Sequence, residues 1–266
     1  MSELAQGRFF KEYGASLDAA LATKAADIEP HLVPGLIVDR GCGTGSLMDY
    51  LAAKNRKVVG IEISDELSRN RAGVIQADVC SQVFADEFVP NIVLSSVLHE
   101  IYSYNDYSTD AVTTCLESCQ SELTADGRLI IRDIWSPEPS DKRYELTFSL
   151  ETWDLFVDFV DRFAGKVEVV VRSDSERTVT LGEASAVEFL SKKDYVQNWD
   201  LELREVFCAL PIPWFEEAAR KLGMKVLVAK PIANEWLRTS RWLHGVQTKG
   251  RPLPPYTNQL IVLGKN

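Results

Sequence analysis

The stretch Leu36-Ile-Val-Asp-Arg-Gly-Cys-Gly-Thr-Gly-Ser-Leu47 joins an apolar run to three glycines at alternate positions. The apolar run is typical of a buried β-strand, and the residues that follow the glycines have the pattern of a helix. Gly41, Gly43 and Gly45 lack a Cβ, so the backbone between these elements can turn tightly and approach a ligand closely. The start of the helix offers unpaired N–H groups and a positive dipole end to an anionic group. We therefore predict an α/β sheet whose first turn binds a nucleotide-like cofactor.

The spacing of the glycines separates two classes of cofactor. Dinucleotide-binding sheets carry G-x-G-x-x-G/A, whose third small residue packs the helix against the strand. Here the spacing is G-x-G-x-G, and Ser46 occupies the third position. This sequence therefore departs from the dinucleotide-binding pattern. A nicotinamide-dependent oxidoreductase is kept only as a third alternative for its function.

One carboxylate follows each of three successive apolar runs. Asp39 ends the first run, Glu62 ends Lys57-Val-Val-Gly-Ile-Glu62, and Asp78 follows Gly73-Val-Ile-Gln-Ala. Each acid alone has a plain alternative, as a turn cap, a solvated strand end or a loop residue. Because open α/β sheets bind ligands at the carboxyl ends of their strands, we expect the three acids to share one site.

Two further segments complete an ordered pattern. Asn91–Glu100 reads as a fourth strand and the loop beyond it, and Leu123–Asp133 reads as a turn, a glycine and a fifth strand. Together the five segments resemble the Rossmann-like (class I) methyltransferases that use S-adenosylmethionine (SAM), strongly over residues 30–135 and weakly elsewhere. The resemblance implies an α/β three-layer sandwich with a mostly parallel seven-stranded sheet and an antiparallel last strand. About 75 residues follow strand five where a minimal member of the family has one helix, so we also expect an inserted α+β lid there.

The resemblance also implies which residues bind SAM and its product S-adenosylhomocysteine. Glu62 is expected to accept hydrogen bonds from the two ribose hydroxyls, since a carboxylate can take two donors at once. Asp78 is expected to contact the adenine amino group. The expected cofactor-binding set is Asp39, Gly41, Cys42, Gly43, Gly45, Glu62, Ile63, Asp78, Val79, Ser95 and Ser96.

His99, just beyond the fourth strand, is the residue best suited to catalysis. Methyl transfer is an in-line displacement that needs no metal, and much of its acceleration comes from holding the acceptor in line in a dry pocket. An imidazole can remove a proton from an acceptor hydroxyl or nitrogen near neutral pH. Glu100 is expected to orient His99 or to act itself, and Asp133 to hold the acceptor. The alternative is that His99 only bonds the cofactor or caps the next helix.

Composition and charge limit the partners. The 266 residues carry a formal net charge of −10, which opposes general nucleic-acid binding. Strand four also lacks the Asp-Pro-Pro-Tyr signature of amino-directed DNA methyltransferases. No apolar run is long enough to span a bilayer, and no signal peptide precedes the first strand, so we expect a cytoplasmic protein. No cluster of potential ligands has metal-binding spacing, so no metal is predicted.

A basic group later in the chain is the exception to the acidic charge. It is either a solvated loop face or a grip on an anionic group of the substrate. Its members are Arg238, Arg241, His244, Lys249 and Arg251.

Three segments are expected along the chain. Residues 1–135 are expected to contain an amphipathic helix over 3–26 and the cofactor-binding half of the core. Residues 136–205 are expected to form an inserted subdomain, and residues 206–266 to complete the sheet of the core. The insertion is predicted to contain a helix over Glu145–Phe163 and another over Ala184–Trp199. Its aromatic residues favour a substrate lid, with a homodimer interface as the alternative.

The sequence thus predicts a methyltransferase that acts on an oxygen or nitrogen of a small molecule, a metabolite or natural-product intermediate. One alternative is an RNA or tRNA methyltransferase that uses the basic group, which would show salt-sensitive RNA binding. The other is a non-catalytic relative that keeps the fold as a scaffold.

Overall fold

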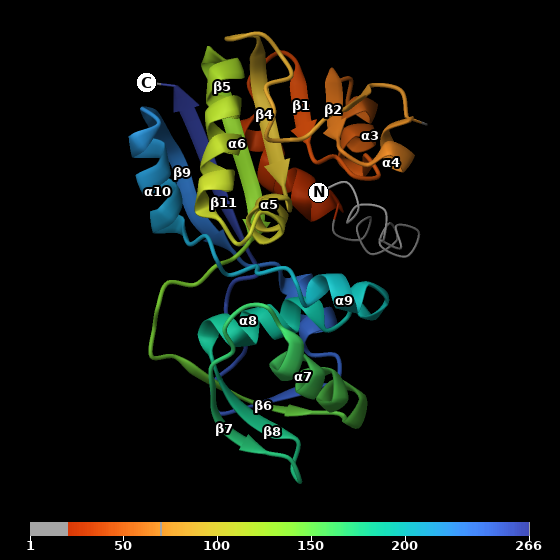
Figure 1. The fold of residues 1–266 in the computed structure, drawn as a ribbon, viewed down its shortest axis with the longest axis vertical. Coiled ribbons are helices and arrows are strands. Elements are labelled where there is room, and N and C mark those ends of the chain that lie inside the picture. Colours follow the sequence, from red (N-terminus) through yellow and green to blue (C-terminus); the bar gives the residue numbers. More distant parts are fainter. Residues whose placement is uncertain (1–20, 70, 266) are drawn as a thin grey trace. The chain divides into compact units, whose positions relative to one another are not determined.

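The computed structural model describes residues 21–69 and 71–265, and the chain forms two compact units (Figure 1). The first unit contains the described residues up to Asp133, Pro213–Lys230 and the described residues from Leu260 onward. The second contains Ile134–Ile212 and Pro231–Gln259. The predicted insertion 136–205 falls inside the second unit, which also takes in 206–212 and 231–259, segments that we expected in the core.

The first unit is built on a seven-stranded sheet with the order β3-β2-β1-β4-β5-β11-β9. The pairs β1–β2, β1–β4, β2–β3 and β4–β5 are parallel. Figure 1 shows β11 running opposite to β4, as predicted for the last strand. The strands are β1 (Ile37–Arg40), β2 (Val58–Glu62), β3 (Val74–Gln76), β4 (Val89–Ser95), β5 (Leu123–Ile134), β9 (Met224–Ile232) and β11 (Asn258–Lys265).

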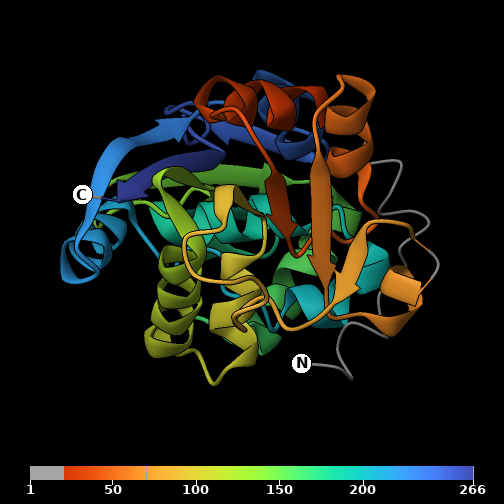
Figure 2. The same cartoon turned by 90° about the horizontal axis from the view of Figure 1, so that it is seen from above.

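Helices cover both faces of this sheet, which explains why its central strands read as continuous apolar runs. All four residues of β1 and six of the seven in β4 are buried. Seen from above, helix 21–28 and α3 lie on one face, and α6 and α10 on the other (Figure 2). The helices of this unit are α3 (Ser46–Ala53), α4 (Asp65–Arg69), α5 (Leu98–Tyr104), α6 (Thr109–Glu122) and α10 (Ile212–Lys221), with a 3₁₀ turn η1 (Glu29–His31).

The second unit has its own sheet and core. Its sheet has the order β10-β6-β8-β7 with antiparallel pairs. The rings of Phe148, Phe156 and Phe189 pack at centroid distances of 5.2–5.3 Å within the core. Its elements are β6 (Arg143–Phe148), α7 (Leu150–Arg162), β7 (Val169–Ser173), β8 (Thr178–Gly182), α8 (Glu183–Lys192), η2 (Val196–Asn198), α9 (Trp199–Glu202), η3 (Leu237–Trp242) and β10 (Val246–Lys249).

The predicted helix over Glu145–Phe163 is wrong at its start, because 145–148 belong to β6. Residues of β6 alternate between buried and half-buried positions, which is the period of a strand. Ser149 then caps α7 by accepting the N–H of Thr152 at 3.3 Å. Most of the predicted helix over 3–26 lies outside the described residues; the remaining 21–26 are helical. Among the described helices, none is long and apolar enough to cross a membrane.

Candidate active site

The glycine turn after β1 is packed on one side and open on the other. Gly41, Gly43 and Gly45 have φ angles of 75°, 52° and 74°, a region that residues with a Cβ seldom enter. The Gly41 N–H donates to the Ile61 carbonyl at 2.8 Å, which fastens the turn to β2. A Cβ on Gly41 would lie 2.7 Å from Val97 Cγ2, whereas a Cβ on Gly43 would meet no atom of the described residues within 4 Å. Space for a ligand therefore remains beside Gly43.

The register of the sheet brings the carboxyl ends of β1 to β5 to one edge. Arg40 of β1 pairs with Ile61 of β2 and with Leu94 of β4, and Ser95 pairs with Arg132 of β5. The predicted site residues end these strands or follow them, so they lie along this edge. Besides the glycines they are Asp39, Cys42, Glu62, Ile63, Asp78, Val79, Ser95, Ser96, His99, Glu100 and Asp133.

Glu62 connects the end of β2 to the glycine turn. Its Oε2 accepts the N–H of Gly43 and its Oε1 accepts the N–H of Ser64, each at 2.9 Å. A carboxylate oxygen has two lone pairs, so each oxygen keeps one for a further donor. The arrangement is compatible with the predicted ribose contact, and it adds a role in shaping the turn that the sequence did not predict.

Asp39 is buried at the end of β1, and its charge depends on its neighbours. Burial raises the pKa of the Asp39 carboxyl to about 6; the Lys24 ammonium opposes this rise and Glu62 adds to it. Burial in turn lowers the pKa of Lys24 to about 8, with Arg132 adding to the fall and Asp39 and Asp133 opposing it. The sequence did not predict Lys24, which comes from helix 21–28. The Asp27–Arg132 ion pair, at 2.8 Å, fastens this helix to β5.

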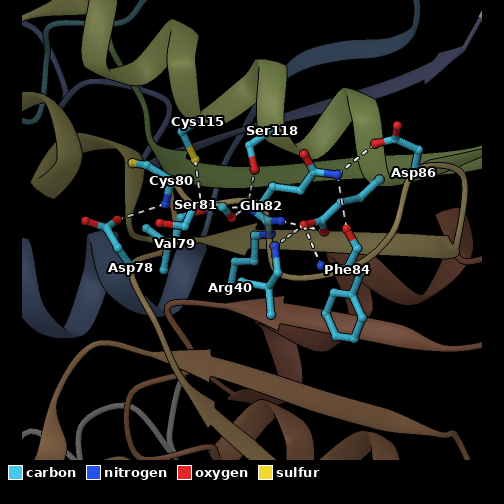
Figure 3. Close-up of polar contacts among 12 residues, drawn as sticks. Arg40, Asp78, Val79, Cys80, Ser81, Gln82, Phe84, Asp86, Cys115 and Ser118 are labelled. Carbon is cyan, nitrogen blue, oxygen red and sulfur yellow. Dashed lines mark hydrogen bonds and ion pairs between the residues drawn. The ribbon is translucent and has the colours of Figure 1, made fainter.

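The loop after β3 carries Asp78, which is predicted to contact adenine, and Val79, which is predicted to bind the cofactor. Asp78 is half-buried, and its Oδ1 accepts the N–H of Cys80 at 2.9 Å (Figure 3). Val79 is 5% exposed, and its carbonyl accepts a hydrogen bond from Arg40 Nη1 at 2.6 Å. On the preceding connection, Ile63 is half-buried. The loop is therefore held from below by β1 as well as by its own turn.

His99 and Asp133 form a buried pair at the ends of β4 and β5. His99 Nδ1 lies 2.6 Å from Asp133 Oδ1. The other carboxylate oxygen, Oδ2, accepts the backbone N–H groups of Leu98 and His99 at 3.0 and 3.2 Å. Asp133 thus holds both the ring of His99 and the first turn of α5. We expected Asp133 to hold the acceptor and Glu100 to orient His99; the structure places Asp133 in the orienting position.

The remaining predicted residues differ in their surroundings. Ser95 is 8% exposed, and its Oγ has no hydrogen-bond partner among the described residues. Ser96 has a φ angle of 59°, and its N–H donates to the Arg132 carbonyl at 2.8 Å. Burial raises the pKa of the Cys42 thiol well above its usual range, so this residue stays a neutral thiol in the turn. Glu100 is half-buried on α5.

Arg71 is a further residue of the turn that sequence reasoning missed. Its Nη1 donates to the Thr44 carbonyl at 2.5 Å and its Nη2 to the Gly45 carbonyl at 2.9 Å. It also pairs with Asp49 on α3 at 2.5 Å. These contacts close the turn from the side of α4. No local pattern around residue 71 marks it, because its partners lie more than 20 positions earlier in the chain.

The predicted basic group is largely paired with acids of the second unit. Arg238 pairs with Glu235, Lys249 with Glu145, and both Arg241 and His244 face Asp194. The fifth member, Arg251, lies over the ring of Tyr144. This pairing favours the solvated-face interpretation over the grip on an anion.

Comparisons with known proteins agree with this geometry. Residues 38–131 match the family model described as "Methyltransferase domain". No curated protein matches the chain in sequence. A SAM-dependent methyltransferase from Archaeoglobus fulgidus matches in structure with a TM-score of 0.54 and 11% identity, covering 97% of this chain and 100% of that one. The 1,6-didemethyltoxoflavin-N1-methyltransferase of Burkholderia thailandensis matches with a TM-score of 0.50 and 13% identity, covering 98% and 83%.

The matched domain contains the glycine turn, His99 and the acids Asp39, Glu62 and Asp78. Residues 38–131 therefore form a methyltransferase domain, and the chain has the Rossmann-like fold seen in SAM-dependent methyltransferase structures. This confirms the class, the cofactor and the mostly parallel seven-stranded sheet that the sequence predicted, whereas the lid role of the insertion stays a prediction.

Proposed function

We propose that the protein transfers the methyl group of SAM to an oxygen or nitrogen of a small-molecule acceptor, with His99 as the general base. The His99–Asp133 pair carries this proposal, because a buried imidazole held by a carboxylate at 2.6 Å is arranged to take up a proton. The His99–Asp133 pair lies at the same edge of the sheet as the glycine turn, where an acceptor and a cofactor can meet.

The residues present fit the cofactor. The open side of Gly43 leaves room for a ligand, and Ser95 Oγ, which has no partner within the described ranges, offers a hydrogen bond at the same edge. Asp39 would face a positively charged group, Glu62 the ribose hydroxyls, and Asp78 the adenine amino group. When bound, SAM supplies a methyl group on a positively charged sulfur.

The chain's own part in the reaction is to position the acceptor and to accept its proton. Since Nδ1 of His99 faces Asp133, Nε2 is the ring nitrogen that receives the proton from the acceptor. Asp133 stabilises the resulting imidazolium and keeps the ring in place. A proton removed in this way leaves an oxygen or nitrogen lone pair free to attack the methyl carbon.

Two structural relatives support a small-molecule acceptor. The Burkholderia enzyme is named for 1,6-didemethyltoxoflavin, and a second matching structure, with a TM-score of 0.50, is titled for echinomycin biosynthesis. The acidic net charge and the ion pairs of the basic group are unfavourable for RNA binding. We therefore rank an RNA or tRNA acceptor, or a non-catalytic scaffold, below a metabolite or natural-product intermediate.

A calorimetric titration with S-adenosylhomocysteine, run in parallel with NAD(H), tests the first step of the proposal. We expect micromolar binding of S-adenosylhomocysteine and no heat from NAD(H). A screen of acceptors with methyl-labelled SAM then follows, with a polyanionic RNA in the panel. Binding of NAD(H) alone, or labelling of RNA and of no small molecule, would overturn the proposal.

A further inference from the structure

A buried ion pair joins β1 to α6 next to the glycine turn in the sequence. Arg40 stands in β1 between Asp39 and Gly41, and Glu122 is the last residue of α6. Arg40 Nη2 lies 2.5 Å from Glu122 Oε2, and both side chains are 0% exposed. A charged residue inside a wholly buried strand is costly unless its contacts compensate for lost hydration. Its contacts therefore indicate what the charge is for.

Those contacts converge on the loop that follows β3 (Figure 3). Arg40 Nη1 donates to the carbonyls of Val79 at 2.6 Å and Ser81 at 3.3 Å. Glu122 Oε1 accepts the N–H groups of Val83 at 2.5 Å and Phe84 at 2.9 Å. One ion pair thus satisfies four backbone groups of the segment 79–84.

The same residue reaches both ends of the proposed cofactor site. The backbone of Arg40 leads into the glycine turn, while its guanidinium holds the loop that begins at Asp78. The guanidinium is fully buried, yet its Nε has no partner among the described residues. The Arg40 guanidinium therefore bonds the loop backbone while one of its own donors, Nε–H, stays unbonded among the described residues.

We propose that Arg40 and Glu122 are a positioning pair that sets the adenine-binding loop, and so determines how well the site distinguishes adenine from other bases. The inference rests on the proposed SAM-binding function. An apolar pair could fill this space without burying charge, but it would remove these hydrogen bonds from four backbone groups of segment 79–84, and only the Val79 carbonyl would keep a bond to a described residue, from Cys115 Sγ at 3.6 Å. The ion pair fixes the position of Asp78 relative to the glycine turn. Recognition of a single exocyclic amino group needs a carboxylate held in one position.

The variant Arg40→Lys tests the pair. Lysine keeps the charge but is a compact point donor, so it cannot bond the two carbonyls and the carboxylate in the geometry of a planar fork. In the ligand-free variant we expect amide hydrogen exchange in segment 79–84 to rise at least about tenfold. S-adenosylhomocysteine should bind roughly 10–100-fold more weakly, the usual effect of losing hydrogen bonds to a charged group.

The decisive readout is selectivity between two ligands. S-inosylhomocysteine carries an oxygen in place of the adenine amino group, and its affinity should change less than about threefold in Arg40→Lys, because it never made the amino contact. The preference for the adenosyl ligand therefore collapses. A general loss of folding would weaken both ligands alike. Arg220→Lys, at an exposed position on α10, is the matched control and should change neither measurement.

If Arg40→Lys does not fold, the double variant Arg40→Met/Glu122→Leu removes both charges, and the same loss of selectivity is expected. Unchanged exchange in segment 79–84, or an unchanged ligand preference in either folded variant, would overturn the positioning role. Failure of the wild-type protein to bind S-adenosylhomocysteine would instead overturn the proposed function. The exchange measurement needs no ligand, so the two failures are distinguishable.

Discussion

At the scale of single residues, Asp133 combines two tasks in one carboxylate. One oxygen lies 2.6 Å from His99 Nδ1, and the other accepts two N–H groups at the start of α5. The side chain that orients the imidazole therefore also fixes the backbone that carries it. An enzyme that must hold a base in line with an acceptor gains from this rigidity, because small displacements cost large factors in rate.

Substitution of the two partners should separate binding from turnover. His99→Ala is expected to lower turnover by roughly 10²–10⁴ while S-adenosylhomocysteine affinity stays within about threefold. Asp133→Asn keeps an oxygen for the N–H groups of α5, so the fold should remain while turnover falls and its pH profile changes. Steady-state rates and calorimetry measure these effects. Normal turnover in His99→Ala would return this residue to a structural role.

Asp39 should make cofactor binding depend on pH. The pKa of Asp39 is raised from 3.8 to about 6, so the folded state is more stable when Asp39 is protonated. This contribution to stability is fully present below pH 3.8 and is lost as the pH rises through 6. The proposed contact of Asp39 with a positively charged group of the cofactor needs the charged carboxylate, so the affinity has the opposite trend. We expect S-adenosylhomocysteine to bind about tenfold more tightly at pH 7 than at pH 5. Asp39→Asn should remove most of this dependence in calorimetry; a slope equal to that of the wild type would exclude Asp39 as its source.

The site residues that could be predicted from the sequence are those whose neighbours in the chain form a recognisable pattern, such as an apolar strand followed by an acid or a glycine. Gly41, Asp39 and Glu62 end or follow apolar strands, so their common edge could be predicted from the parallel sheet alone. Arg71 and Glu122 could not be found this way, because their contacts join segments far apart in the chain. Arg40 did carry a signal, a charge inside a buried strand, that names no partner until the fold is known.

At the scale of elements, the glycine turn has one glycine packed against the protein, Gly41, and one with open space beside it, Gly43. Gly41→Ala should lower the free energy of unfolding by about 1–3 kcal/mol, since φ is 75° and the new methyl would meet Val97. Gly43→Ala adds its methyl into open space, so we expect S-adenosylhomocysteine affinity to fall at least about tenfold with only the strain of φ as a stability cost.

Gly223→Ala is the matched control, because Gly223 also has a positive φ, 64°, and an added Cβ there meets no atom within 4 Å in the part of the chain that the structure describes. Urea denaturation and calorimetry should show the same strain without a change in affinity. If Gly43→Ala binds S-adenosylhomocysteine as the wild type does, the cofactor does not occupy the open side of the turn.

The elements of the first unit were easier to predict than those of the second. Strands β1, β2 and β4 are short apolar runs bounded by turns, whereas β6 shares its aromatic residues with α7 in one continuous segment. Aromatic side chains suit both a strand and a buried helix face, so their number did not distinguish them. The alternation of Tyr144, Leu146 and Phe148 and the capping Ser149 were the available signals.

At the scale of the whole molecule, each unit has a core of its own. Phe156 is 0% exposed among the aromatic rings of the second unit. Phe156→Ala should lower the free energy of unfolding of this unit by about 3–5 kcal/mol through lost burial and a cavity. Hydrogen exchange should rise there, while S-adenosylhomocysteine still binds the first unit within about threefold of wild type.

Leu150→Ala, on the same helix but 63% exposed, is the control and should change the unfolding free energy by less than about 0.5 kcal/mol. A loss of S-adenosylhomocysteine binding in folded Phe156→Ala would show that the first unit's site does not form independently of this core.

The position of β11 in the sheet order has a consequence for synthesis. This strand lies between β5 and β9, yet among the strands of residues 21–69 and 71–265 it is the last to leave the ribosome. At the usual rate of about 5–20 residues per second, β5 waits on the order of ten seconds for its neighbour while residues 135–257 are made. During that interval β5 presents an open edge to other chains. Newly made copies should therefore depend on chaperones until translation ends, and a stop codon before β11 should yield an aggregating product.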